Sequence, residues 1–345
     1  MTAVRTRDAA TDVVAPEALP APKGHVVAHL LHDRSALAGL GLVSLLCLGA
    51  LLAPVLAPHD PNAVDVVRRF SPPSGEFPLG TDHLGRDVLS RLLHGGRLSI
   101  GATLVATAGI STIGVVLGLL AGYLVGAVDS VVSRIIEVLL ALPAYLLALA
   151  VTGVLGPGLV NLTIAITAVW WASYARLVRG FVLAETGRAY VEAARALGAS
   201  GTRIAVRHVL PNILAPVVVL TTLDLGAVLL GLSSLSFLGL GVQPPTAEWG
   251  AMLSEGRVYL GPAPNMMLFP GAAIFVMVLG FNLVGDGLRD ALDPRTRQGV
   301  ARRPRRRLAA WRPGAPWAAT GTATARGSTG RDAGHGEPSG RTPPC

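Results

Sequence analysis

Long apolar stretches alternate with short polar ones along most of the chain, and this alternation predicts a bundle of membrane-spanning helices. A helix needs about 20 mostly apolar residues to cross a hydrocarbon core about 30 Å thick. Six such stretches are expected, at Ser35–Ala57, Leu98–Gly126, Ile135–Leu155, Leu159–Ser173, Ile213–Leu238 and Met266–Val284. The predicted fold is an all-α integral membrane protein with about six transmembrane helices.

Some predicted spans carry finer signals. Glycines recur at every fourth position of the second span, at Gly114, Gly118, Gly122 and Gly126. They share one helix face, where the missing side chains let another helix pack closely. Pro143 is expected to kink the third span. The fourth span is expected to continue as a helix past Arg176 and Arg179.

The most distinctive polar stretch between two spans, residues 185–211, is called the elbow below. Strong helix formers predict a first helix over Thr186–Leu197, and Gly198 stands where a helix commonly ends in a left-handed residue. A second helix is expected to end at Pro211, because proline in a helix interior costs about 3 kcal/mol. The elbow is thus predicted to be a helix–turn–helix on an aqueous face of the protein.

Small side chains suit the first helix of the elbow to contact with another protein. Ala193, Ala194 and Ala196 leave one side of it flat, and Glu192 offers a charge beside them. The simpler alternative is a solvated loop with some local helix, since Glu-Ala-Ala occurs in many alanine-rich helices. The spacing of Glu-Ala-Ala from the glycine at 198 and the Leu-Pro pair at 210–211 is more specific, and it favours a docking site.

Composition and charge agree with a membrane protein. Of the 345 residues, 51% are hydrophobic and 14% are charged, which is typical of a polytopic membrane protein. The formal net charge is +8, and Lys23 is the only lysine. The arginines gather in the elbow and the C-terminal tail, which the positive-inside rule places in the cytoplasm together with both termini. This rule accounts for the basic charge, so nucleic-acid binding is not expected.

The chain divides into four predicted parts. Residues 1–33 form a disordered cytoplasmic tail, and residues 34–97 hold the first span and an outer segment. Residues 98–290 form a core of five helices that contains the elbow. Residues 291–345 form a second disordered cytoplasmic tail, rich in Arg, Pro and Gly. Its arginines between positions 302 and 307 either contact anionic membrane lipid or only fix the topology.

The outer segment contains a run, Pro78–Arg97, whose apolar residues at 88, 89, 92 and 93 share one face. This pattern predicts a short helix lying in the membrane interface. Asp82, His83 and Asp87 lie close together in the same run and raise the question of a metal site. Two carboxylates and one imidazole around a glycine turn are more often helix caps and salt bridges, so no metal is expected.

The sequence offers no motif for catalysis or cofactor binding. A phosphate-binding loop needs a lysine before Ser or Thr, and Lys23 is followed by Gly24, so the chain is not expected to hydrolyse ATP. Asp224 is the one clear ionisable residue deep in a span, at a cost of roughly 2.5–3.5 kcal/mol. It is either a polar point on a translocation path or a partner in a local hydrogen bond with Thr221 or Thr222.

Four long motifs resemble those of one transporter family. Residues 191–217, VEAARALGASGTRIAVRHVLPNILAPV, resemble the cytoplasmic EAA loop of permease subunits of binding-protein-dependent ABC importers. Residues 78–101, 235–253 and 282–295 resemble the dipeptide/oligopeptide/nickel branch of that family. The resemblance covers residues from about 30 to 297, so that only the tails lie outside it.

The resemblance implies a type I ABC importer permease fold in the cytoplasmic membrane of a prokaryote, acting on di- or oligopeptides. It also implies a second, usually different permease subunit, two cytoplasmic ATP-binding subunits that hydrolyse ATP, and an extracytoplasmic solute-binding protein. The residues that it assigns to the ATPase-coupling loop are Glu192, Ala193, Ala194, Arg195, Gly198, Arg203 and Pro211.

One departure from the family pattern and several alternatives stay open. Family members often carry a glutamate three residues before the Leu-Ser-Phe-Leu-Gly-Leu-Gly run, where this chain has Leu232. The role of that glutamate is absent here or has moved, for example to Asp224. Nickel or another small solute is the alternative substrate. From other classes, a self-sufficient secondary carrier gives the elbow no task, and a non-transporting scaffold leaves Asp224 unexplained.

Overall fold

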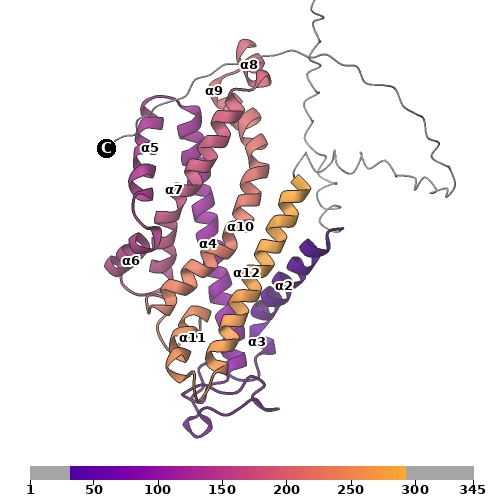
Figure 1. Cartoon of the computed structure of the whole chain (residues 1–345), viewed down its shortest axis with the longest axis vertical. Coiled ribbons are helices and arrows are strands. Elements are labelled where there is room, and N and C mark those ends of the chain that lie inside the picture. Colours follow the sequence, from indigo (N-terminus) through magenta and orange to yellow (C-terminus); the bar gives the residue numbers. More distant parts are fainter. Residues whose placement is uncertain (1–31, 293–345) are drawn as a thin grey trace, which may run out of the picture. The chain divides into compact units, whose positions relative to one another are not determined.

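The computed structural model describes residues 32–292, which are almost entirely helical and contain no strand. The all-α prediction is confirmed for this part of the chain, whereas the predicted tails lie outside it except for residues 32–33 and 291–292. The helices are α2 (Arg34–Leu51), α3 (Ala53–Leu56), α4 (Val88–Tyr123), α5 (Ala127–Leu140), α6 (Ala144–Leu155), α7 (Leu159–Thr186), α8 (Ala189–Ala196), α9 (Gly201–Ile204), α10 (Leu210–Phe237), α11 (Trp249–Gly256) and α12 (Asn265–Leu292) (Figure 1). A long, mostly non-helical segment joins α3 to α4, and a shorter one joins α10 to α11.

Within residues 32–292, four helices are long and apolar enough to cross a membrane, and five are if a bent pair is counted as one span. The four are α2, α4, the continuous helix Gly201–Phe237 that includes α10, and α12. The bent pair is α5 and α6. The predicted number of six is therefore not reached by length and hydropathy alone. Helix α7 has 28 residues, but Arg176 and Arg179 lower its apolar character.

Helices α4 and α7 run side by side in the same direction. Later glycines of α4 contact later residues of α7: Gly109 lies against Thr167, Gly118 against Val178 and Gly122 against Val182. Two consecutive segments that run parallel need a return segment between them. Helices α5 and α6 supply that return, and an ion pair from Asp129 to Arg179, at 2.6 Å, fixes α5 against α7.

The remaining long helices are antiparallel to their neighbours. Helix α10 packs on α7 in the opposite direction, since Trp170 meets Gly231 while the Tyr174 hydroxyl donates to the Val217 carbonyl at 2.9 Å. Helix α12 runs back along α10, and α2 runs along α12 with Ala36 against Gly287. The helices α7, α10, α12 and α2 thus alternate in direction, and α12 lies between α10 and α2 (Figure 1).

The separate interfacial helix expected in Pro78–Arg97 does not form. The backbone is non-helical up to Asp87, and the apolar residues from Val88 onward are the first turns of the 36-residue helix α4. Asp87 begins this helix, because its carboxylate accepts from the Ser90 backbone N–H at 3.0 Å. Glycines at 95, 96 and 101 do not stop the helix. The helix formers on both sides, together with packing against α11, carry it through.

Pro143 breaks the third predicted span where a kink was expected. Helix α5 ends at Leu140, α6 begins at Ala144, and their axes differ by 91°. The residues between the second and third predicted spans, which include Asp129 and Arg134, are also helical, because α5 already starts at Ala127. Proline disfavours a helical residue before it. The chain therefore leaves the helix just before Pro143 and starts a new one after it.

The predicted glycine face is confirmed for three of its four members. A Cβ at Gly114, Gly118 or Gly122 would lie within 3.0 Å of side-chain or backbone atoms of α7, so each lets α7 approach α4 closely. Gly126 is different. It lies beyond the end of α4 with φ 120°, and it precedes the first residue of α5. Its role is to turn the chain, which a side chain would oppose.

Replacing Gly118 by alanine is expected to destabilise the bundle by about 1–3 kcal/mol, the typical cost of overpacking. The new Cβ would lie 2.7 Å from the Ala175 carbonyl oxygen and 2.8 Å from the Val178 Cβ. The matched control is Gly101→Ala in the same helix, where no atom lies within 4 Å. Thermal unfolding of the purified variants in detergent checks this. Equal melting temperatures for both would contradict close α4–α7 packing.

Candidate functional site

The elbow folds into two short helices separated by a left-handed glycine, as predicted. The first, α8, begins at Ala189 rather than Thr186, because α7 ends at Thr186 and Gly187 separates the two helices. Gly198 has φ +81°. Its N–H bonds the Arg195 carbonyl and the next N–H, of Ala199, bonds the Ala194 carbonyl, which is the Schellman ending of a helix.

Three apolar side chains anchor the elbow to the bundle. Val191, Ile204 and Val209 are each at most 1% exposed, and they belong to the main apolar cluster, which also contains Val182 of α7. Ala194 packs against the same cluster. It therefore faces the bundle and not a docking partner, unlike the flat outer side of three alanines expected from the sequence.

The outer face of the elbow carries the other predicted docking residues. Those exposed to solvent are Glu192, Ala193, Arg195, Gly198, Arg203 and Pro211. Leu197, which was not singled out from the sequence, is 88% exposed. The face is thus a small apolar centre, formed by alanines and one leucine, with charges of both signs around it. Figure 1 places α8 and α9 at one end of the described chain, where they project from the ends of α7 and α10.

Pro211 does not end the second helix of the elbow. Helix α9 continues through a π-helical stretch, Ala205–Val209, directly into α10, so residues 201–237 form one continuous helix. Proline lacks an N–H and crowds the carbonyl of the preceding turn. The wider π turn before Pro211 removes that conflict. The second helix of the elbow is consequently a direct extension of α10.

A hydrogen-bond network ties the elbow to α7. The Tyr190 hydroxyl donates to the Glu185 carboxylate at 2.5 Å and accepts from the Asn212 amide at 2.8 Å. Asn212 also donates to the His208 carbonyl at 2.7 Å, within the π turn. Burial, followed by the hydrogen bond to Glu185, raises the pKa of Tyr190 to about 12. Residues distant in sequence build this network, and no local motif signals it.

Asp224 lies on α10 without a hydrogen bond or ion pair to any residue among 32–292. The local hydrogen bond considered from the sequence, between Asp224 and Thr221 or Thr222, does not form. The hydroxyls of Thr221 and Thr222 donate to the carbonyls of Val217 and Val218 instead. Asp224 is half-buried. The cost of an unpaired carboxylate in a span makes water or solute its expected neighbour.

Leu232 occupies the place of the family's usual glutamate and is a core residue. It is 3% exposed and packs in the main apolar cluster. Asp224 precedes it by eight residues (232 − 224), or about 12 Å along a helix. Asp224 therefore does not take the same place in space.

The buried carboxylate of this region is Glu248, which sequence reasoning missed. It is 1% exposed and accepts from Ser99 Oγ at 2.8 Å and from the Gly250 and Ala251 N–H groups at the start of α11. It also accepts from Ser236 Oγ. Glu248 thereby joins α4, α10 and α11, and its role is to position them.

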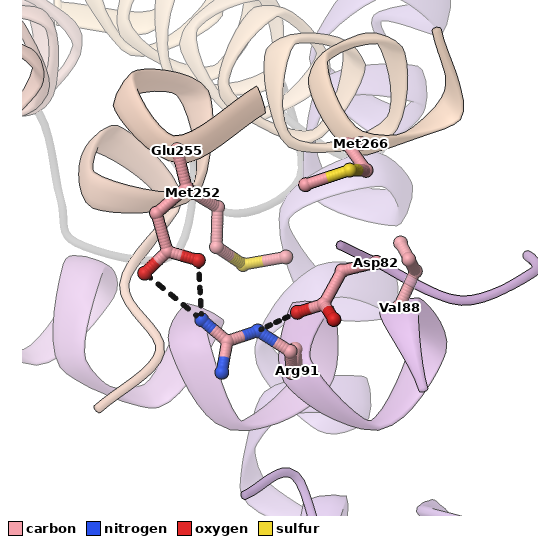
Figure 2. Close-up of a pocket in the computed structure, with 6 residues that line it drawn as sticks. All are labelled: Asp82, Val88, Arg91, Met252, Glu255 and Met266. Carbon is pink, nitrogen blue, oxygen red and sulfur yellow. Dashed lines mark hydrogen bonds and ion pairs between the residues drawn. The ribbon is translucent and has the colours of Figure 1, made fainter. Parts of the chain in front are cut away.

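The outer segment is held to α11 by two buried arginines. Arg86 donates to Asp82 at 2.6 Å and to Glu255 at 2.8 Å, and it is 1% exposed. Arg91, also 1% exposed, lies between the same two carboxylates, 3.1 Å from Glu255 and 3.6 Å from Asp82 (Figure 2). A further Arg91 hydrogen bond reaches the Pro245 carbonyl at 3.1 Å.

Asp82, His83 and Glu255 lie close enough together to consider a metal ion, with ligand atoms within 4.8 Å of one another. Two guanidinium groups already balance the two carboxylates, and a cation would have to displace them. Burial lowers the pKa of His83, so its ring is neutral at pH 7. The predicted roles as caps and salt bridges are confirmed for Asp82 and Asp87. The arrangement favours a structural role, in which these ion pairs hold the outer segment to α11.

Two family models match the chain. Residues 114–298 match the binding-protein-dependent transport system inner membrane component, and residues 24–73 match the N-terminal transmembrane domain of oligopeptide transport permease C. Together they cover α2, the end of α4 and all helices from α5 to α12 with the elbow, and the first alone covers more than half of the chain.

Curated proteins similar to the chain carry permease names. It is 44% identical over 289 residues to the di/tripeptide transport system permease protein DppC of Pseudomonas aeruginosa, covering 81% of this chain and 95% of that protein. It is 43% identical over 253 residues to the nickel transport system permease protein NikC of Escherichia coli K12, covering 73% and 91%.

A third relative is the dipeptide transport system permease protein DppC of Alkalihalophilus pseudofirmus, 42% identical over 266 residues, with 77% of this chain and 88% of that protein covered. Each alignment spans most of both proteins, and the same helical framework with its elbow is therefore shared along nearly the whole described chain. The chain belongs to the family of binding-protein-dependent transport system inner membrane components, the permease subunits of ABC importers.

Proposed function

We propose that this chain is the permease subunit of an ABC importer that carries di- or oligopeptides across the cytoplasmic membrane of a prokaryote. The similarity to di/tripeptide and dipeptide permeases at 42–44% identity over most of both chains carries this proposal. The elbow, exposed and rigidly continuous with α10, is the feature of the chain that such a role needs.

The topology of the proposal has six crossings. Helix α7 is the sixth, since it runs parallel to α4 and links the outer turn before Leu159 to the elbow. The series α2, α4, α5–α6, α7, α10, α12 then alternates in direction, with the elbow, the start of α2 and the end of α12 on the same side. The arginines in the elbow support a cytoplasmic location for that side.

Transport in this proposal is driven by partners. Two cytoplasmic ATP-binding subunits bind the elbows of the two permease subunits, and one of them binds the outer face of this chain's elbow, around Glu192, Ala193 and Leu197. A second, different permease subunit completes the path, and an extracytoplasmic binding protein delivers the solute. Closure of the ATP-binding subunits moves the elbow, and α10 moves as a rigid body with it.

The path itself is proposed to run beside Asp224. A carboxylate facing lipid at the bilayer centre is costly, whereas one facing a wet cavity is not. Asp224 has no partner among the described residues that would compensate its charge, which supports a position on the path and not in the packed core.

Nickel is the second candidate solute. The chain is 43% identical to the nickel permease of Escherichia coli K12 over 91% of that protein. The pore region alone does not separate the two solutes, because the binding protein in such systems selects the solute.

ATP-dependent uptake tests the proposed function. The complete assembly is reconstituted in proteoliposomes with ATP enclosed and binding protein outside. Radiolabelled alanyl-alanine and ⁶³Ni²⁺ are then compared. Uptake of the dipeptide that needs ATP and the binding protein is expected. Uptake of nickel alone favours the second candidate, and uptake of either solute by this chain without ATP-binding subunits would overturn the importer proposal.

A further inference from the structure

One face of α10 stays uncovered along its outer half. Ala227 and Ser234 are exposed and Leu230 is 44% exposed, whereas Gly226, Val228, Leu229 and residues 231–233 are buried. Positions three or four apart lie on one side of a helix. Asp224, three residues before Ala227, continues the same line. We call these four residues, Asp224, Ala227, Leu230 and Ser234, the open strip.

The composition of the open strip does not suit contact with lipid. It has a carboxylate near one end, a hydroxyl at the other and a small residue between them. An acidic side chain facing the hydrocarbon core is disfavoured, so the strip suits a wet cavity.

Asp224 brings a negative charge to this strip that nothing nearby neutralises. Two carboxylates on α5 are paired instead: Asp129 binds Arg179, and Glu137 lies 3.5 Å from Arg134. In a cavity of low effective dielectric, a single unpaired charge acts strongly on a passing ion. It attracts cations and repels anions.

We infer that the open strip is a cation-recognising subsite of the translocation path, in which the Asp224 carboxylate pairs with the positive group of the solute. That group is the terminal ammonium of a peptide or a metal dication, and both chemistries fit one unpaired carboxylate. This inference deepens the proposed path at Asp224 and rests on it. The new element is that the group of the solute recognised on the path carries a positive charge.

Cysteine labelling at Ala227 tests the inference directly. The chain carries Cys47→Ser, Cys345→Ser and Ala227→Cys, and it is assembled with its partners in membrane vesicles. Reaction rates are measured with two thiol reagents of similar size, trimethylammonium-ethyl methanethiosulfonate, a cation, and sulfonatoethyl methanethiosulfonate, an anion. Adding Asp224→Asn is expected to lower the cation-to-anion rate ratio about tenfold or more, because the field of the carboxylate acts on the two reagents with opposite sign.

The matched control is Glu137→Gln, which removes a paired carboxylate on α5 and should leave the ratio unchanged. A cysteine at 227 that neither reagent reaches means that the strip is not wet, and both the proposed path and the inference fail. A cysteine that reacts with an unchanged ratio in Asp224→Asn overturns the inference alone and leaves the path intact.

Uptake then identifies the source of the positive group. The maximal rate of uptake is measured in vesicles that hold the complete assembly, for the wild type and for Asp224→Asn. The solute is alanyl-alanine or Ni²⁺, whichever the wild-type assembly transports. A loss of about tenfold for the dipeptide identifies the ammonium, and the same loss for Ni²⁺ identifies the metal. An unchanged maximal rate overturns the inference.

Discussion

Glu192→Arg is expected to release the ATP-binding subunits from the permease while leaving the helix bundle folded. Glu192 is exposed on α8, so the substitution disturbs no packed side chain. In the docked state it reverses a charge beside the apolar centre of the contact, and losing a charge pair that docking buries costs about 2–5 kcal/mol. Co-purification of the ATP-binding subunits should fall about tenfold or more, and ATP-driven uptake should fall with it.

A control with the same change of charge lies in the outer segment. Glu76→Arg alters an exposed carboxylate whose partner Arg68 is itself 44% exposed, and exposed pairs contribute only about 0–1 kcal/mol. Its ATP-binding subunits should stay bound. The thermal stability of both variants should match the wild type. ATP-binding subunits that co-purify normally with Glu192→Arg would remove the elbow as the docking site.

Arg91→Leu is expected to cause the largest loss of stability among single changes in the outer segment. The Arg91 guanidinium lies between Asp82 and Glu255 and also bonds the Pro245 carbonyl (Figure 2). Removing one partner of a buried ion pair typically costs 3–5 kcal/mol, because charges stay behind without compensation. For a chain of this size the melting temperature should drop by about 4–9 °C.

Arg68→Leu is the matched control for this prediction. Arg68 also contacts two carboxylates, Asp65 and Glu76, but all three side chains are 44–57% exposed. Its removal should cost no more than about 1 kcal/mol. The two variants are compared by thermal unfolding in detergent and by proteolysis of residues 58–87. A similar drop for both would mean that burial of Arg91 does not stabilise the outer segment.

Hydropathy predicted the positions of the long helices well where the apolar pattern alone determines them. Helices α4, α10 and α12 lie where apolar stretches were expected, and the glycine at 198 ends α8 in the left-handed form. These features depend on residues close in sequence: a run of apolar side chains, or a residue without Cβ. Helix α7 also extends past Arg176 and Arg179 as expected, up to Thr186.

Prolines were harder to interpret, since the same residue has opposite effects at two sites. Pro143 stands at a break between helices whose axes differ by 91°, whereas the helix runs through Pro211. The difference lies in what surrounds each proline. Before Pro211 a π turn opens the backbone, and the Asn212 amide donates to the His208 carbonyl within that turn. Sequence near a proline does not reveal such support.

Contacts between distant residues were beyond the reach of sequence patterns. Arg91 and Glu255 are 164 residues apart, and Ser99 and Glu248 are 149 residues apart. The sequence motifs at 78–101 and 235–253 were recognised separately, and only the folded chain shows that they meet. The elbow was predictable as an exposed helix–turn–helix, but its continuity with α10, on which the proposed coupling depends, was not.

Affinity purification of the full chain from its native membrane, followed by identification of the proteins that accompany it, tests the central claim most directly. The account predicts two ATP-binding subunits, a second permease and, with solute present, an extracytoplasmic binding protein. A chain that purifies without ATP-binding subunits, as a stable homo-oligomer that transports solute alone, would contradict it.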